Sequence, residues 1–248
     1  MDNIIVTTWT HNSYEDIWPM YYGQFKKHAP ELKHALFINE KVQHESIPGN
    51  CIQVVNNEKE DFAQRWLSCM NQISEDNIIY MQEDFVLYDR VNIEWIKKVQ
   101  NFLNESDYSY VRLIKSGVEG GPCVDSDLKI WEVPQSSQYV FSCSATIWKR
   151  KQFIKLFDYY RPKTILDSEL YGSHACRALK IKGCYVYDNE PKRGSLHYDS
   201  SIFPYIATAL VGHSLGGPSR WLYKHYKEEL ETLLKEYKID PQVRGIIP

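Results

Sequence analysis

The sequence predicts an α/β fold in which a mostly parallel sheet is flanked by helices. Three observations support this prediction. Apolar runs alternate with amphipathic segments over the first hundred residues, in the order β-α-β-β-α-β-α. The 248 residues are 43% hydrophobic, which is enough to build one sizeable core. No Pro/Gly/Ser-rich linker interrupts the chain, so we expect residues 1–248 to form a single domain.

The first half of the chain carries the regular part of this pattern. Short apolar runs predict four strands, at residues 4–8, 35–38, 52–55 and 78–81. A first helix over residues 16–27 tolerates Pro19 in its first turn. A second helix, over residues 61–73, has apolar side chains at helical spacing. Asn92 is suited to cap a third helix that runs through Leu103.

The second half is less regular. Strands are expected at residues 110–114, 139–148 and 184–187, with an edge strand at 129–133. Helices are expected at residues 151–160 and 168–180, and a final helix should begin at Pro218. In the helix over 168–180, Asp167 or Ser168 is suited to be the N-cap.

Charge and composition exclude several classes of protein. The formal charge of −3 and the lack of a dense basic cluster argue against nucleic-acid binding. The six cysteines are scattered without a CxxC pair, which indicates reduced thiols and a cytoplasmic protein. The N-terminus lacks the pattern of a signal peptide, and no apolar run approaches about 18 residues, so no transmembrane segment is expected.

The strand expected at residues 78–81 runs directly into two acids, Glu83 and Asp84, before the apolar run resumes. Two anions at the end of a buried strand are costly unless a positive charge meets them. In an open α/β sheet, this edge is also where ligands bind. Hard divalent cations prefer carboxylate oxygens, so the pair favours a cation that carries a diphosphate. The alternative is a solvated strand end at a turn.

The order and character of these segments resemble GT-A type glycosyltransferases, nucleotide-sugar-dependent enzymes with a Rossmann-like sheet. The resemblance rests on the first strand, on Asp61-Phe-Ala-Gln-Arg-Trp-Leu67 and on Tyr80-Met-Gln-Glu-Asp-Phe85. Within the last of these, Gln82-Glu83-Asp84 is similar to a degenerate DxD metal motif. Residues 142–149 and 167–172 resemble the acceptor side of small bacterial and phage-type members. The resemblance implies a nucleotide-binding half, residues 1–115, and an acceptor half, residues 116–248.

The resemblance also implies roles for particular residues. A divalent cation, Mn²⁺ or Mg²⁺, would be held by Asp84 and His197, with Glu83 as an indirect partner. The donor would be a UDP-hexose such as UDP-glucose or UDP-galactose, and the acceptor a glycan, lipid or protein hydroxyl. Contacts to the nucleotide are expected from the end of the first strand and from two residues of the second predicted helix: Thr8, Trp9, Thr10, Asp61 and Arg65. Structural alternatives remain, since His197 can be a packed histidine and Asp61 with Arg65 a simple intrahelical ion pair.

Inverting transfer requires a carboxylate that accepts the proton of the acceptor hydroxyl. The resemblance places this base at a helix start and favours Glu169 over Asp167. An acid in the first turn of a helix also suits the helix dipole, which is the structural alternative. Inversion is expected, with retention left open.

The segment Gly212-His-Ser-Leu-Gly-Gly217 matches the GxSxG nucleophile elbow of α/β-hydrolases. A serine hydrolase built on Ser214 would need an acid and then a histidine downstream, yet His225 precedes Asp240. The other interpretation is a glycine-rich loop near the phosphates, with Arg220 and Lys224 as charge partners. A further alternative to a transferase is a sugar-nucleotide-binding protein without turnover.

Overall fold

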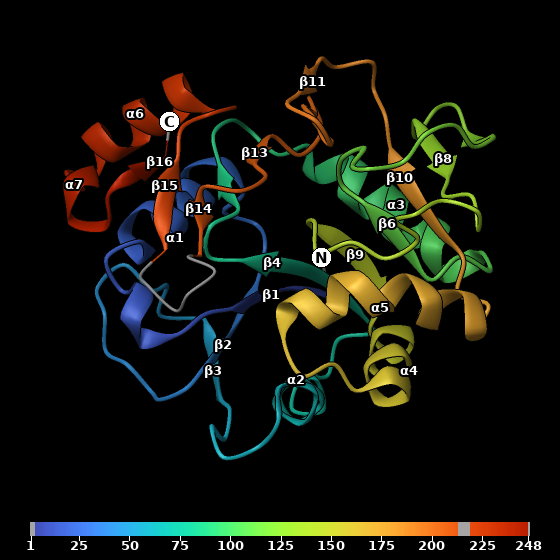
Figure 1. The fold of residues 1–248 in the computed structure, drawn as a ribbon, viewed down its shortest axis with the longest axis horizontal. Coiled ribbons are helices and arrows are strands. Elements are labelled where there is room, and N and C mark those ends of the chain that lie inside the picture. The colour runs from blue at the N-terminus through green and yellow to red at the C-terminus, as the bar shows by residue number, and fades with distance from the viewer. Residues whose placement is uncertain (1–2, 213–218, 248) are drawn as a thin grey trace.

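A computed structural model of the chain describes residues 3–212 and 219–247. A nine-stranded sheet in the order β3-β2-β1-β4-β9-β6-β10-β8-β7 forms its centre (Figure 1). Only β8 and β9 run against the other strands, so the sheet is mostly parallel, as predicted. Its strands are β1 (Ile4–Trp9), β2 (His34–Ile38), β3 (Ile52–Val55), β4 (Asn77–Gln82), β6 (Tyr110–Arg112), β7 (Cys123–Asp125), β8 (Ile130–Glu132), β9 (Thr146–Lys149) and β10 (Gly183–Val186).

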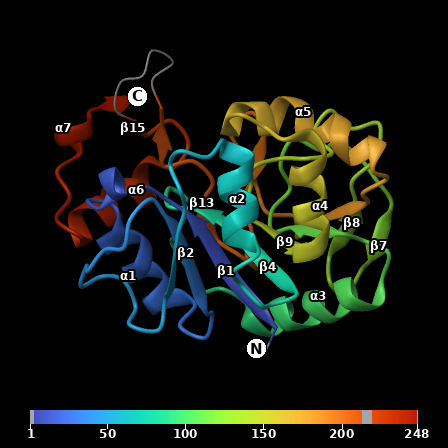
Figure 2. The ribbon, with the colours of Figure 1, turned by 90° about the horizontal axis from the view of Figure 1, so that it is seen from below.

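Helices cover both faces of this sheet because each buried strand alternates its side chains between them. Trp9 of β1 stacks on Trp66 of α2, while the neighbouring Thr8 bonds Tyr21 of α1 on the opposite face. Figure 2 shows α2, α4 and α5 together on one side of the strands. The helices are α1 (Trp18–His28), α2 (Phe62–Met70), α3 (Ile93–Glu105), α4 (Arg150–Tyr160), α5 (Ile165–Ala178), α6 (Lys227–Glu236) and α7 (Pro241–Arg244). A 3₁₀ turn, η1 (Asn12–Tyr14), precedes α1.

Short strands outside the main sheet tie the C-terminal segment to the N-terminal half. β5 (Val86–Leu87) pairs with β13 (Tyr205–Ile206), and β11 (Lys192–Arg193) pairs with β12 (His197–Tyr198). β14 (Leu210–Val211), β15 (Arg220–Leu222) and β16 (Ile246–Ile247) form a small third sheet. Among the described residues, no helix is both long and apolar enough to cross a membrane.

The regular first half confirms the predicted order of strands and helices. Asp61 caps α2 and Asn92 caps α3, each through a side-chain oxygen that accepts a backbone N–H. The two acids after β4 lie in a turn, closed by a hydrogen bond from the Phe85 N–H to the Gln82 carbonyl. The apolar run therefore does not continue as one strand through Glu83 and Asp84.

Four predictions for the second half are wrong. The strand expected over residues 139–148 is confined to β9, because Arg112 and Ser173 engage the backbone of residues 139–141. The strand expected as an edge strand at residues 129–133 forms β8, which pairs with β7 and so is not at the edge. α5 begins three residues early, because Thr164 caps it in place of Asp167 or Ser168. Residues 220–222 form β15, and the following helix starts only at Lys227, while Pro218 lies outside the described residues.

Candidate functional site

A pocket of about 340 Å³ lies where the carboxyl ends of β1 and β4 meet the start of α5. Trp9 and Gln82, the last residues of the two strands, both line it. Neighbouring parallel strands that end at one edge form the usual ligand crevice of an open α/β sheet. We call this cavity the Trp9 pocket, and its lining consists of Trp9, Thr10, His11, Tyr14, Phe62, Arg65, Trp66, Tyr80, Gln82, Glu83, Lys163, Thr164 and Ile165.

Aromatic stacking fixes one wall of the Trp9 pocket. The rings of Trp9 and Trp66 lie 4.7 Å apart between centroids at an interplanar angle of 17°. Trp66 also contacts Phe153 and Phe157 of α4, so the pair is anchored in the core. The Arg65 guanidinium lies 5.7 Å from the centroid of the Trp9 ring. The wall thus combines a fixed flat surface with a positive charge, which suits a planar anionic ligand.

The acidic pair divides between this pocket and the interior. Glu83 lines the Trp9 pocket, whereas Asp84 is 9% exposed and is not part of the lining. Burial raises the pKa of Glu83 to about 8 and that of Asp84 to about 7, and the neighbouring Asp84 contributes to the shift of Glu83. Carboxylate oxygens are the ligands that a hard divalent cation prefers, but only Glu83 of the pair lines the pocket, so their role in holding a metal ion stays a prediction.

His197 lies in a different cavity. This cavity, of about 150 Å³, is also lined by Thr208, Leu222, His225 and Tyr226. Burial, followed by the proximity of His225, lowers the pKa of His197 to about 4. Within residues 3–212 and 219–247, no three His, Cys, Asp or Glu side chains are grouped so that they could hold a metal ion. The role of His197 as a metal ligand stays a prediction.

The predicted nucleotide contacts occupy several environments. Thr10 lines the Trp9 pocket and accepts a hydrogen bond from Trp18 Nε1 at 3.2 Å. Thr8 is buried against Tyr21, at 2.7 Å between the two hydroxyl oxygens. Asp61 accepts the Gln64 N–H as the cap of α2 and forms no ion pair with Arg65. Arg220 is exposed on β15, outside the pocket lining.

The two candidate bases differ in their surroundings. Asp167, the third residue of α5, accepts a hydrogen bond from the Lys163 N–H at 3.0 Å. Glu169 lies in the second turn, on the exposed side of the helix, close enough to raise the pKa of both Tyr80 and Cys143. Desolvation in turn raises the pKa of Glu169 itself. Neither carboxylate is among the residues that line the Trp9 pocket, so the choice of Glu169 over Asp167 as the base stays a prediction.

Some lining residues have no counterpart among the predicted contacts. Lys163, Thr164 and Ile165 come from the start of α5, more than 80 residues after the end of β4 and more than 150 after the end of β1. The spacing of Thr164 and Asp167 is a usable N-terminal helix signal that would have moved the predicted helix start to this point. Trp66 shows only the helical spacing of a core residue, so its sequence context carries no signal for a site.

The residues that a serine hydrolase would use are not brought together among the residues that the structure describes. Ser214 lies outside the described residues. His225 lines the cavity of His197, and Asp240 caps α7 by accepting the Gln242 N–H. Lys224 follows β15 in the chain.

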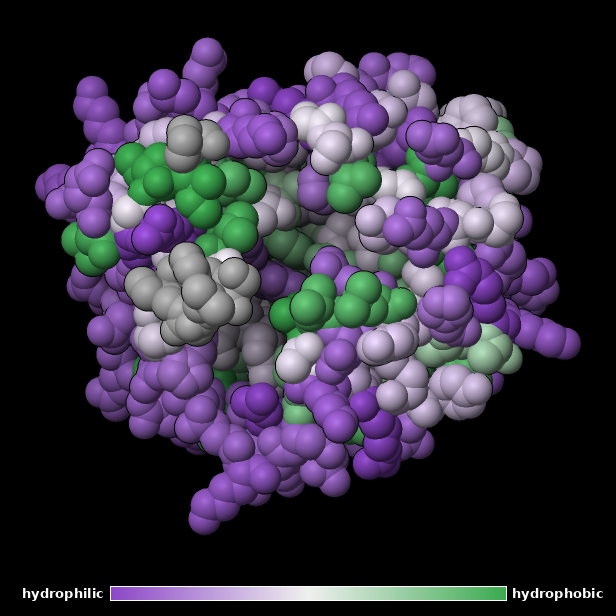
Figure 3. Space-filling model, viewed as in Figure 1, coloured by the Kyte–Doolittle hydropathy of each residue, from purple (hydrophilic) through white to green (hydrophobic). Residues whose placement is uncertain are grey.

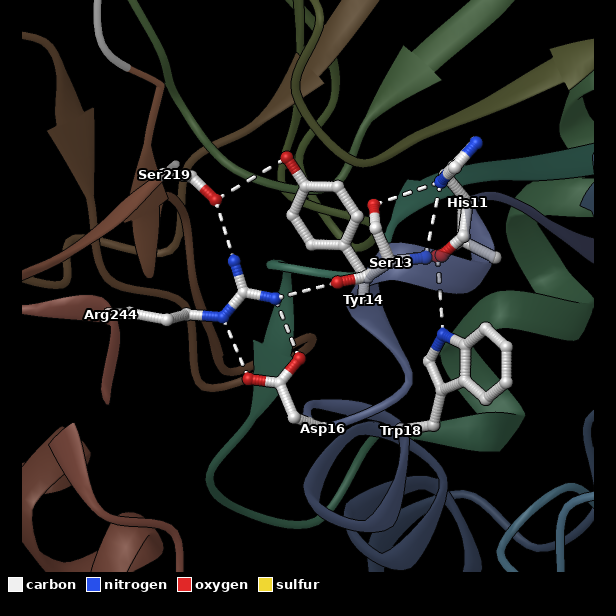
Figure 4. A network of polar contacts seen from close by, with 8 residues as sticks. His11, Ser13, Tyr14, Asp16, Trp18, Ser219 and Arg244 are labelled. Atoms are coloured by element: carbon white, nitrogen blue, oxygen red, sulfur yellow. Dashed lines mark hydrogen bonds and ion pairs between the residues drawn. The ribbon is translucent and has the colours of Figure 1, made fainter. Parts of the chain in front are cut away.

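A polar network joins the C-terminal segment to the loop after β1, which forms part of the pocket wall (Figure 4). Arg244 donates two hydrogen bonds to the Asp16 carboxylate, at 2.7 and 2.6 Å, and a third to Ser219 Oγ at 3.0 Å. Ser219 in turn donates to the Tyr14 hydroxyl at 3.3 Å. Because Tyr14 lines the Trp9 pocket, the network fixes a pocket residue from a distant part of the chain.

Arg244→Met is expected to lower the free energy of unfolding by about 1–2 kcal/mol. The variant loses a two-bond ion pair in which the arginine side chain is only 10% exposed, but the 40% exposure of Asp16 limits the loss. Chemical denaturation measures this change. Lys27→Met, which breaks an ion pair to Glu236 with both partners well exposed, is the control and should change stability by less than about 0.5 kcal/mol.

Comparisons with known proteins bear on the fold. No protein-family model matches the sequence, and no curated protein is similar to it in sequence. Among solved structures, Staphylococcus aureus TarS matches 79% of this chain at 12% identity and a TM-score of 0.50. A cytidylyltransferase from Leptospira borgpetersenii matches 97% of this chain and 97% of its own length, also at 12% identity and a TM-score of 0.50.

The chain has a GT-A-type fold. It spans 36% of the length of TarS. TarS 1–349 has also been solved in complex with UDP-GlcNAc, and this structure matches 79% of the chain at 15% identity and a TM-score of 0.48. The predicted α/β architecture is therefore confirmed, whereas the roles of individual residues are matters for proposal.

Proposed function

We propose that this protein transfers a hexose from a nucleotide-diphosphate sugar, bound in the Trp9 pocket, to an acceptor hydroxyl. The observation that carries this proposal is the composition of that pocket at the carboxyl edge of β1 and β4. It combines the stacked Trp9, the Arg65 guanidinium and the Glu83 carboxylate within one cavity. Trp9 suits the flat ring of a base, Arg65 suits a diphosphate, and Glu83 suits the divalent cation that would accompany it.

Uridine is the base that we propose. TarS, which shares the fold, has been solved with UDP and with UDP-GlcNAc. The donor would then be a UDP-hexose, with UDP-glucose and UDP-galactose as the first candidates. The comparisons do not distinguish between these sugars, so the test includes both together with UDP-GlcNAc.

The residues of the pocket, together with Asp84 and Glu169, would have the following roles. Arg65 and Lys163 place positive charge beside the diphosphate, which stabilises the charge that develops on the leaving group. Glu83 and Asp84 would hold Mn²⁺ or Mg²⁺, which supplies further positive charge when bound. Glu169 would accept the proton of the acceptor hydroxyl as the new glycosidic bond forms and the bond to the diphosphate breaks. One such displacement inverts the configuration of the anomeric carbon.

The first test is a thermal-shift panel of UDP, GDP, CMP, CTP and the UDP-sugars, each with Mn²⁺ or with EDTA. A ligand at 100 times its dissociation constant stabilises the folded state by about 2.7 kcal/mol. For a domain of this size, we expect UDP with Mn²⁺ to raise the Tm by about 5–10 °C. Arg65→Ala and Asp84→Asn should each abolish most of this rise, and EDTA should reduce the rise seen with the wild type.

Glu105→Gln is the matched control, since it neutralises an exposed carboxylate at the end of α3 and should respond as the wild type does. A protein that UDP, GDP and CMP all fail to stabilise would not fit the proposal. A rise specific to CTP would instead favour nucleotidyl transfer, the activity named for the Leptospira neighbour. Binding of a UDP-sugar without release of UDP in the presence of any acceptor would favour a binding protein without turnover.

A further inference from the structure

The outward side of α5 is apolar over its first two turns. Ile165, Leu166, Leu170 and Tyr171 are 41%, 59%, 56% and 57% exposed, respectively. In Figure 3, hydrophobic residues form a band across the centre of the molecule, where Figure 1 places α5, and a hollow lies beside this band. We call these four residues the α5 stripe.

Packing within the described fold does not account for the α5 stripe. The inward side of the helix is made by small residues, and it lies so close to its support that a Cβ at Gly172 would meet the Phe141 ring at 2.6 Å. Ser173 also bonds the backbone of Phe141. A surface helix normally directs polar residues outward, so a group of exposed apolar side chains marks a binding surface.

The α5 stripe is continuous with the Trp9 pocket. Ile165 belongs to both, because it lines the pocket and is still 41% exposed. Glu169 follows Ile165 by four residues and therefore lies one turn further along the same side of the helix. Leu166 and Leu170 form the adjacent row. An acceptor hydroxyl that reaches Glu169 would thus bring the rest of its molecule against apolar side chains.

We propose that the α5 stripe binds the apolar part of an amphiphilic acceptor, a sugar or alcohol that carries an alkyl or acyl chain next to the hydroxyl that reacts. This inference rests on the proposed function, because it places the acceptor relative to Glu169. The stripe extends over about 9 Å of helix, which suits one such chain. A stable dimer needs about 800 Å² and 20 or more residues from each partner, far more than four side chains provide.

The test compares the binding of octyl β-D-glucoside and methyl β-D-glucoside, below the micellar concentration, by isothermal titration calorimetry. The protein is saturated with UDP and Mn²⁺. We expect the octyl compound to bind at least tenfold more tightly. The free energy gained by burying two of its methylenes is already enough for a tenfold difference in affinity. The double variant Leu166→Asn/Leu170→Asn should reduce the octyl affinity to the methyl level and leave UDP binding unchanged.

Val243→Asn is the control, because Val243 on α7 is the most exposed large apolar residue of those that the structure describes, at 79%, and lies outside the stripe. It should keep the full octyl preference. Equal affinities for the two glucosides, or an octyl preference that survives in the double variant, would overturn the proposal. So would a wild-type dimer, detected by light scattering, that the double variant abolishes.

The same design separates failure of this inference from failure of the proposed function. If UDP does not bind, the proposed function fails, while the octyl preference of the unliganded protein still tests the stripe. Tight binding to phosphatidylcholine vesicles without a preference for octyl over methyl glucoside would assign the stripe to a membrane surface and overturn the proposal.

Discussion

Glu169→Gln is expected to slow hexose transfer by about 100- to 10,000-fold, which is the usual contribution of a positioned general base. Glutamine has nearly the same shape but does not accept the hydroxyl proton. Because Glu169 lies on the exposed side of α5, the change should leave the Tm and the UDP-induced thermal shift close to those of the wild type. Initial rates of UDP release with and without acceptor measure the effect.

Asp167→Asn is the matched control. Asp167 accepts the Lys163 N–H, a bond that asparagine can also accept, so we expect a decrease of less than about tenfold. The reverse order of the two effects would assign the base to Asp167. An equal, small effect of both would remove general base catalysis by α5 from the mechanism.

The pH profile provides an independent readout of the same residue. Glu169 acts in its deprotonated form, and desolvation raises its pKa above the ordinary value. The rate should therefore decrease on the acid side at a higher pH than for a solvated carboxylate. In Glu169→Gln, this acid limb should be absent from the residual rate of UDP release.

Local sequence signals predicted the elements of the first half of the chain because each element is defined by neighbouring residues. Asn92 caps α3 as predicted, and the acidic pair marks the end of β4. The resemblance to GT-A glycosyltransferases predicted Arg65 and Trp9 as nucleotide contacts, and both line the pocket. These predictions needed no knowledge of the second half of the chain.

The remainder of the site depends on contacts between distant segments. Lys163 and Thr164 reach the Trp9 pocket because α4 packs on α2 and α5 packs on α4. Nothing local to Lys163 indicates that contact. His197 has the residue type of a ligand, but β12 places it in a separate cavity with His225. Residue type thus supplied the candidates, whereas tertiary packing determines which of them line the pocket.

The failed strand over residues 139–148 has a similar cause, and it leads to a second large expected effect. Arg112 is 1% exposed, and its guanidinium donates to the carbonyl of Ser116 at 3.1 Å, to that of Val140 at 2.8 Å and to that of Tyr139. These carbonyls are therefore directed at one side chain and not at a neighbouring strand. A pattern of apolar residues contains no information about such a bond.

Arg112→Met is expected to lower the free energy of unfolding by about 3–5 kcal/mol. Methionine fills much of the same volume but leaves three carbonyls without their donor, and each unpaired buried group costs about 1–3 kcal/mol before relaxation. Urea denaturation measures the change. Arg150→Met is the control: Arg150 also donates to two carbonyls, at 2.7 and 3.1 Å, but it is only half-buried, so a loss of about 1–2 kcal/mol is expected.

The same substitution should also loosen the support of the candidate base. The Phe141 N–H donates to Ser173 of α5 at 3.0 Å, so the segment that Arg112 holds is the surface on which α5 rests. In the absence of denaturant, amide hydrogen exchange in Arg112→Met should therefore become faster over residues 139–145 and over α5. The amides of β1 and β4 should remain protected under the same conditions. Uniform acceleration across the whole sheet would show that Arg112 stabilises the fold globally and does not act through α5. Local acceleration, together with a slower transfer rate and unchanged UDP binding, would show that the position of Glu169 depends on a buried arginine far from it in sequence.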